Sequence, residues 1–148
     1  MHHHKEIKYL PFKPIELFNI VLDIESYPQF IPWCSGARIT ERSENHLLAD
    51  LVINYKGVNT QYTSKVEFSD TYTNNGKYHI KVDHIKGPFK KLTNNWAFSL
   101  GKKEGEVKLE FEIDFEMSSS ILNKMIGVVF HSATHKMVEA FEKRAYEV

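Results

Sequence analysis

Two histidines near the end of the chain have a spacing that can bind a metal ion. His131 and His135 lie four residues apart, which puts both side chains on one face of a helix. Ser132, Ala133 and Thr134 lie between them, so the glutamate of the zinc-protease pattern does not occur. We therefore interpret both as surface or helix-end residues and predict no metal site.

Cys34 is the single cysteine, which excludes an internal disulfide and a cysteine-rich metal site. No nucleophile signature surrounds it, so we predict a small buried apolar group. The carboxylates between residues 106 and 116 alternate with apolar residues, which assigns them to the solvent face of a strand. The sequence therefore predicts no catalytic pair, no enzyme and no required cofactor.

The charge balance argues against binding to DNA. The 148 residues include 19 basic and 19 acidic ones, whereas a general nucleic-acid binder shows a basic excess. Lys86, Lys90 and Lys91 come closest to a basic patch, and they fit a solvated turn.

The length fits one domain, residues 1–148. No run approaches the ~18 apolar residues of a membrane span, and the N-terminus resembles neither a signal nor a transit peptide. We expect a cytoplasmic protein that can lie at the periphery of the inner membrane. His2 to His4 are either native or the remnant of a tag, and residues 1–4 are left out of the site predictions.

The segment from Asp23 to Ile39 combines prolines with large apolar side chains. Pro28 and Pro32 prevent it from forming one regular helix. Tyr27, Phe30 and Trp33 on such a backbone must be covered by a core, a ligand or a partner.

Regular elements surround this segment. Residues 7–10 fit a strand, Pro14 begins a helix that continues to Leu22, and residues 26–30 fit one short turn. From Ala37 the apolar period becomes two, which predicts about six antiparallel strands. Their clearest markers are a turn at Asn74-Asn75-Gly76 and an eleven-residue alternation over 106–116.

Residues 121–146 predict one long helix with an N-cap among Ser118 to Ser120. Its apolar stripe contains Leu122, Met125, Ile126, Val129, Phe130, Ala133, Met137, Val138 and Phe141. A curved sheet covered mainly by one helix either retains an elongated apolar pocket or packs shut, and the pattern alone favours neither.

Several spaced motifs carry a family resemblance. They are residues 23–39, Ala49-Asp50-Leu51, residues 62–66, residues 87–92, Trp96-Ala97-Phe98, residues 111–115 and residues 137–145. With these motifs the chain resembles the coenzyme Q-binding proteins and ribosome-association toxins of the START-like (SRPBCC, polyketide cyclase/dehydrase-like) superfamily. The resemblance implies an α+β helix-grip fold: a curved antiparallel sheet of six to seven strands around a long C-terminal helix, with two short helices after the first strand.

The resemblance also implies a hydrophobic tunnel for a quinone with an isoprenoid tail. We predict two lids at its mouth, one from Phe30, Pro32 and Trp33 and the other from Gly87, Pro88 and Phe89. The alternative is that these residues only plug the core. The predicted lining consists of Leu51, Ile53, Tyr55, Tyr62, Val66, Phe68, Trp96, Phe98, Leu109, Phe111, Ile113, Val129, Phe130 and Met137, all of which are equally acceptable as ligand-free core.

The polar ends of a few side chains are candidate contacts of the quinone. Tyr55, Tyr62 or Trp96 is the candidate partner of a quinone carbonyl. Lys90 is a candidate headgroup contact, or else a free surface lysine.

Three functions follow from these readings. The first is non-enzymatic binding of ubiquinone or a related isoprenoid lipid in support of respiration, with transient membrane contact through Phe30, Ile31, Trp33 and Phe89. The second is binding to the large ribosomal subunit, which blocks subunit association. The third is a small cyclase or dehydratase.

Overall fold

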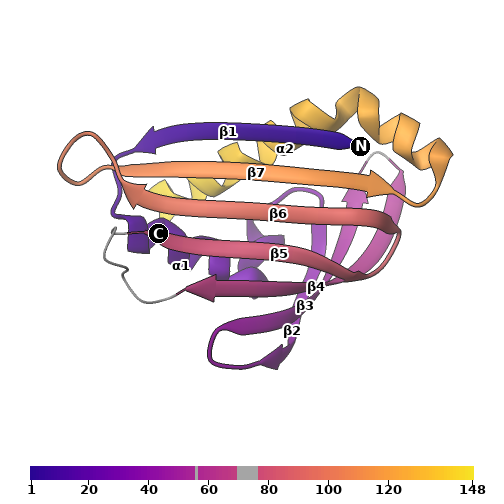
Figure 1. The fold of residues 1–148 in the computed structure, drawn as a ribbon, viewed down its shortest axis with the longest axis horizontal. Coiled ribbons are helices and arrows are strands. Elements are labelled where there is room, and N and C mark those ends of the chain that lie inside the picture. Colours follow the sequence, from indigo (N-terminus) through magenta and orange to yellow (C-terminus); the bar gives the residue numbers. More distant parts are fainter. Residues whose placement is uncertain (56, 70–76) are drawn as a thin grey trace.

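The computed structural model describes residues 1–55, 57–69 and 77–148 (Figure 1). The predicted turn at Asn74-Asn75-Gly76 lies outside these residues. In chain order the described elements are β1 (His2–Leu10), α1 (Pro14–Leu22), η1 (a 3-10 helix, Ile24–Gln29), β2 (Cys34–Arg42), β3 (His46–Tyr55), β4 (Val58–Ser69), β5 (Tyr78–Lys86), β6 (Phe89–Leu100), β7 (Val107–Met117) and α2 (Ser120–Glu147).

All seven described strands form one antiparallel sheet in the order β1-β7-β6-β5-β4-β3-β2. The sheet curves, and α2 runs along its concave side behind β1 and β7 (Figure 1). The predicted α+β helix-grip architecture is confirmed.

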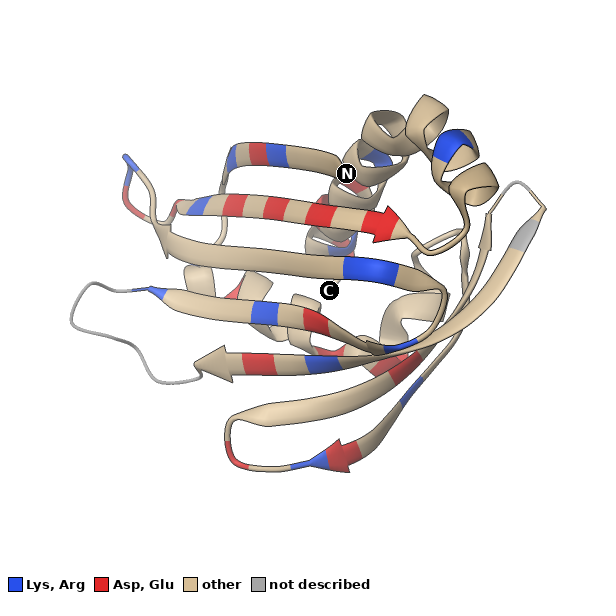
Figure 2. Cartoon of the chain, turned by 45° about the vertical axis from the view of Figure 1, so that its right-hand side comes forward, with Lys and Arg blue, Asp and Glu red and all other residues tan. Residues whose placement is uncertain are grey.

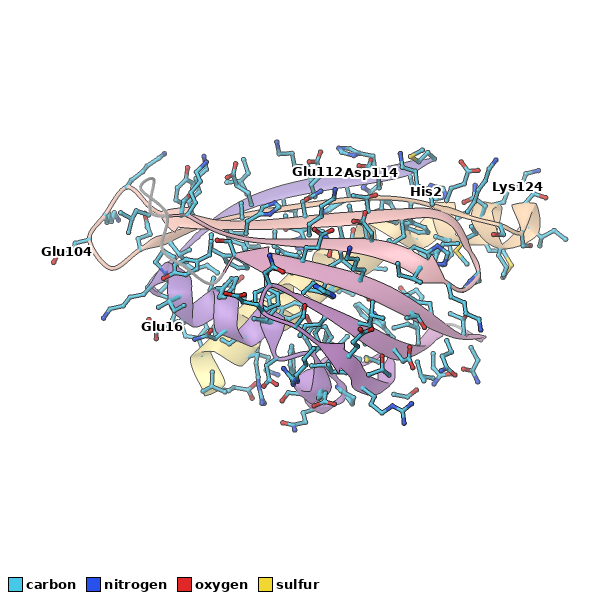
Figure 3. The ribbon with its side chains drawn as sticks, turned by 60° about the horizontal axis from the view of Figure 1, so that its bottom comes forward. His2, Glu16, Glu104, Glu112, Asp114 and Lys124 are labelled. Atoms are coloured by element: carbon cyan, nitrogen blue, oxygen red, sulfur yellow. The ribbon has the colours of Figure 1, made fainter. Side chains whose placement is uncertain are left out.

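The alternation along β7 gives the sheet a dry and a wet face. Val107, Leu109 and Phe111 are buried. The acidic residues between them alternate along the strand in Figure 2, and Glu112 and Asp114 lie on the outer surface of the sheet in Figure 3. The carboxylates of this strand are therefore a solvated surface, as predicted.

The helix α2 begins where the serine run predicts. Ser119 is the N-cap, and its hydroxyl accepts a hydrogen bond from the backbone N–H of Leu122 at 3.3 Å. The buried face of α2 recurs every three or four residues at Phe130, Thr134, Val138, Phe141 and Ala145.

The predicted apolar stripe of α2 is wrong at Met125. Its side chain is 53% exposed, together with those of Ile121 and Val128. These three residues follow one another on the outer face of the first turns of α2, which no described element covers.

At the N-terminal end, α1 starts with Pro14 at its first turn, and the Glu16 carboxylate accepts the backbone N–H of Lys13 at 2.9 Å. Leu17 and Phe18 face the core. The first strand is longer than the predicted residues 7–10, because His2 to His4 also pair with β7.

The interior contains two apolar clusters. The larger one lies beside α1 and includes Phe18, Phe98 and Phe111, each at most 1% exposed. Burial of each such ring stabilises the fold by roughly 1.5–3 kcal/mol. The smaller cluster lies where α2 begins and consists of Leu92, Phe115, Met117 and Phe130.

Candidate functional site

Two adjoining cavities lie between α2 and the sheet. The inner cavity has a volume of about 130 Å³ and lies in the larger cluster. The outer cavity has a volume of about 180 Å³ and lies in the smaller cluster. Trp33, Ile53, Tyr62 and Met137 line both, so these four side chains form the boundary between the two spaces.

The walls come from inward positions of the strands and from one face of α2. The strands β3, β4 and β6 contribute Leu51, Val66 and Trp96 to the inner cavity because alternate residues of a strand share a face. From α2, Met137 and Phe141 close it, whereas residues closer to the N-terminus of α2 close the outer cavity.

No Asp, Glu, Lys, Arg or His is among the described residues that line the two cavities. The titratable lining groups are tyrosines and Cys34. Burial raises the pKa of the Tyr27 and Tyr62 hydroxyls and of the Cys34 thiol, so all three are neutral at physiological pH. The cavities are therefore uncharged.

Two of the lining polar groups have partners inside the protein. The Tyr27 hydroxyl donates to the backbone carbonyl of Val21. The Trp96 indole N–H donates to Asn94 Oδ1 at 2.8 Å, and Asn94 Nδ2 donates to the backbone carbonyl of Glu112 at 2.9 Å. Since an indole has one donor, Trp96 is not the predicted partner of a quinone carbonyl.

Many of the predicted site residues do line a cavity. In the inner cavity or at its boundary are Trp33, Leu51, Ile53, Tyr62, Val66, Trp96 and Met137. The outer cavity adds Tyr55, Phe89, Ile113, Val129 and Phe130. Trp33 and Phe89, one from each predicted lid, thus meet at the same outer cavity.

Other predicted residues lie elsewhere. Phe68, Phe98, Leu109 and Phe111 pack in the larger cluster and line neither cavity, because α1 covers that end of the sheet. Pro88 lies in the turn between β5 and β6, where its carbonyl accepts the backbone N–H of Ser118.

Lys90, the candidate headgroup contact, lines neither cavity. Its ammonium lies 3.3 Å from a carboxylate oxygen of Glu116, and its side chain is 72% exposed. It belongs to the outer surface of the sheet because it follows Phe89, which points inward.

Most of the first predicted lid lies outside the two cavities. Phe30 and Pro32 line a surface groove against the C-terminal half of α2 and neither of the two cavities. The Phe30 ring packs edge-on against Phe141 at 5.3 Å, with the Arg144 guanidinium 5.1 Å from its centre. Only Trp33 of this lid reaches the interior.

The predicted membrane-contact residues do not form an exposed patch. Ile31 is buried, and Phe30, Trp33 and Phe89 are partly buried. None of the helices in residues 1–55, 57–69 and 77–148 has the length and apolar character needed to cross a membrane.

The helix histidines contact β1. His131 Nδ1 lies 3.0 Å from His4 Nδ1, and His135 Nδ1 lies 3.0 Å from a Glu6 carboxylate oxygen. Both histidines are exposed, as predicted. His3 lies within 3.5 Å of Glu112 and 2.6 Å of Asp114. Figure 3 shows these two carboxylates on the outer surface of the sheet, so this group is separate from the helix histidines.

Sequence reasoning missed the polar lining residues. Ser64, Asn94 and Thr134 line the cavities but were not predicted as site residues. The alternation of apolar residues along the strands could have identified two of them. Ser64 takes an inward position between Tyr62 and Val66, and Asn94 takes one between Leu92 and Trp96.

Known proteins match the chain over almost its whole length. Residues 10–142 match the family described as "Polyketide cyclase / dehydrase and lipid transport". The chain is 48% identical to "Ribosome association toxin RatA" of Rickettsia prowazekii (strain Madrid E), over 95% of this chain and 94% of that protein. It is 25% identical to "Coenzyme Q-binding protein coq10, mitochondrial" of Schizosaccharomyces pombe, over 92% of this chain and 82% of that protein.

Solved structures also resemble this fold. A solved structure described as a START superfamily protein from Mycobacterium smegmatis superposes with a TM-score of 0.78 at 18% identity, covering 99% of both chains. The fold is therefore START-like, and the sequence matches show that the chain belongs to the family described as "Polyketide cyclase / dehydrase and lipid transport".

Proposed function

We propose that this protein binds an isoprenoid lipid of the quinone class between α2 and the sheet and catalyses no reaction on it. The observation that carries this proposal is the pair of uncharged cavities joined at Trp33, Ile53, Tyr62 and Met137. An apolar chain gains ~25 cal/mol for each Å² of its surface that leaves water in such a space.

The lining chemistry supports binding over catalysis. General acid–base catalysis needs a group whose pKa lies near the working pH. The neutral Tyr27, Tyr62 and Cys34 have pKa values shifted upward, away from that range. The family description includes lipid transport, and one relative is named for coenzyme Q binding.

The volumes indicate how a longer ligand must enter. Each cavity is smaller than the ~300 Å³ at the lower end of small-molecule sites, and only the two together reach it. A lipid that fills both must displace the boundary. Met137 is suited to this because its unbranched thioether adapts to new packing at low cost.

The test uses decylubiquinone, a quinone with a short alkyl tail. The two tryptophans, Trp33 and Trp96, both line the inner cavity, so a quinone bound there quenches their emission. We expect the fluorescence quenching to saturate as quinone is added. Most of the quenching should persist in Trp33→Phe and in Trp96→Phe, because each variant keeps the other tryptophan at the cavity. Absence of saturable quenching, together with no quinone in a solvent extract of the purified protein, would contradict the proposal.

A second function has its own support, the 48% identity to a protein named ribosome association toxin. On this reading the chain binds the large ribosomal subunit and blocks subunit association. The zero net charge disfavours binding through phosphate neutralisation alone. The test is sedimentation with purified large subunits at increasing salt. Co-sedimentation that persists at moderate salt supports this function, and complete loss at low salt argues against it.

A further inference from the structure

Two buried polar atoms in the described part of the chain have no hydrogen-bond partner, and they belong to neighbouring residues. They are the hydroxyl oxygen of Ser64 on β4 and the Nε2 atom of His84 on β5. Ser64 is 1% exposed and lines the inner cavity. An unpaired buried polar group destabilises the fold, so two side by side indicate a place where a further group binds.

The regular pairing of β4 with β5 puts the two residues directly opposite each other. Thr63 pairs with Lys86, but Ser64 pairs with His84, so Ile85 is an extra residue in β5. This bulge follows the pair and does not create it, because the register is unbroken from Ser69 opposite His79 to Ser64 opposite His84. Alternation along β5 puts His84 on the same inward face as Ile80 and Val82, whereas Ile85 is exposed.

His84 lines neither cavity, but its ring contacts Phe89, which lines the outer one. Its ring packs edge-on against Phe89 at 5.6 Å, and Phe89 packs edge-on against Tyr62 at 5.1 Å. Phe89 lines the outer cavity and Tyr62 lines both. Ser64 and His84 therefore lie beside the boundary where a ligand would pass from one cavity into the other.

We propose that Ser64 and His84 together bind the carbonyl oxygen at the polar end of the lipid. A serine hydroxyl donates one hydrogen bond, and a neutral imidazole protonated at Nε2 donates another. Directly opposite strand residues have Cβ atoms about 4.5–5.5 Å apart, a spacing at which one oxygen can accept from both side chains. This inference rests on the proposed function, and it assigns the ligand a carbonyl-bearing head at the boundary between the two cavities.

The test compares decylubiquinone, labelled with ¹³C at its carbonyl groups, with farnesane, a branched hydrocarbon without oxygen. Ser64→Ala and His84→Leu each remove one donor and are expected to weaken quinone binding about three- to tenfold. Farnesane binding should stay unchanged. His84→Gln is expected to restore quinone affinity, because its side-chain amide can donate in place of the imidazole. Ser99→Ala is the matched control, since Ser99 is a buried serine of β6 that lines neither cavity.

Infrared spectroscopy gives a second readout. One labelled carbonyl band should shift to lower frequency in the wild-type complex and return toward its hydrocarbon-solvent position in Ser64→Ala and His84→Leu. Unchanged quinone affinity in both variants, an equal loss of farnesane binding, or an unshifted band would overturn the inference and assign the two groups to packing or to a bound water. If neither ligand binds the wild type, the proposed function itself fails.

Discussion

The glycine between β5 and β6 shows how one residue shapes the cavity wall. Gly87 has φ = +146°, and a Cβ there would lie 2.5 Å from the Cβ of Tyr62. The turn therefore packs its backbone directly against a residue that lines both cavities. A side chain at this position would have to push the turn away from Tyr62.

We expect Gly87→Ala to lower the free energy of unfolding by about 1–3 kcal/mol and to weaken quinone binding. The strained φ and the contact with Tyr62 both contribute to the loss. Urea denaturation and the quenching titration measure the two effects. Gly105→Ala is the control, because Gly105 also has a positive φ but no atom within 4 Å of an added Cβ. If both variants bind quinone equally well, Tyr62 is not held by this turn.

The buried hydroxyls and the thiol predict how stability depends on pH. Burial raises the pKa of Cys34 above its ordinary 9.0, and those of Tyr27 and Tyr62 above 10.0. Above these ordinary values the unfolded chain loses protons that the folded chain keeps, so the free energy of unfolding falls as pH rises.

We therefore expect stability to decrease from about pH 9 upward, first through Cys34 and then through the two tyrosines. Urea denaturation between pH 8 and pH 10.5 measures the slope. The variant Cys34→Ala should have a flatter profile around pH 9. An identical profile in wild type and variant would show that the thiol has the same pKa in both states.

At the scale of elements, the strands were predictable and the irregular segment was not. Strict alternation in β7 and β4 identified the inward faces, because one face of each strand is solvated. The segment with Phe30, Pro32 and Trp33 has no such period, so its sequence does not tell which side chain points inward. That depends on Phe141 and Arg144 of α2, more than a hundred residues later.

The N-cap of α2 leads to a prediction about the stability of this helix. Ser119→Ala removes the side chain that accepts the Leu122 N–H, and it should cost about 0.5–2 kcal/mol of stability. Because the first turns of α2 close the outer cavity, quinone affinity should fall as well. Ser118→Ala is the control, since the neighbouring Ser118 bonds Pro88 through its backbone N–H and not through its side chain. Equal stability of the two variants would mean that the cap contributes nothing.

For the whole molecule, the sequence predicted the helix-grip fold but left the interior undecided between packed and hollow. The reason is physical: alternation shows which residues point inward, and the volume left between them depends on where α2 lies against the sheet. At the α1 end Phe18, Phe98 and Phe111 fill the space. Toward the start of α2 neither α1 nor η1 covers the sheet, and the outer cavity lies there.

Met137 lines both cavities, so a substitution there tests whether the two cavities form one binding site. Met137→Trp puts a larger side chain at the boundary, so it should block quinone binding and remove the stabilisation that a ligand provides, about 2.7 kcal/mol at a hundredfold excess over Kd. Val128→Trp places the same residue on the exposed face of the same helix and should leave both unchanged. Calorimetric titration and thermal unfolding with and without decylubiquinone measure the effects. If Met137→Trp binds quinone as tightly as Val128→Trp does, the ligand occupies a different part of the molecule.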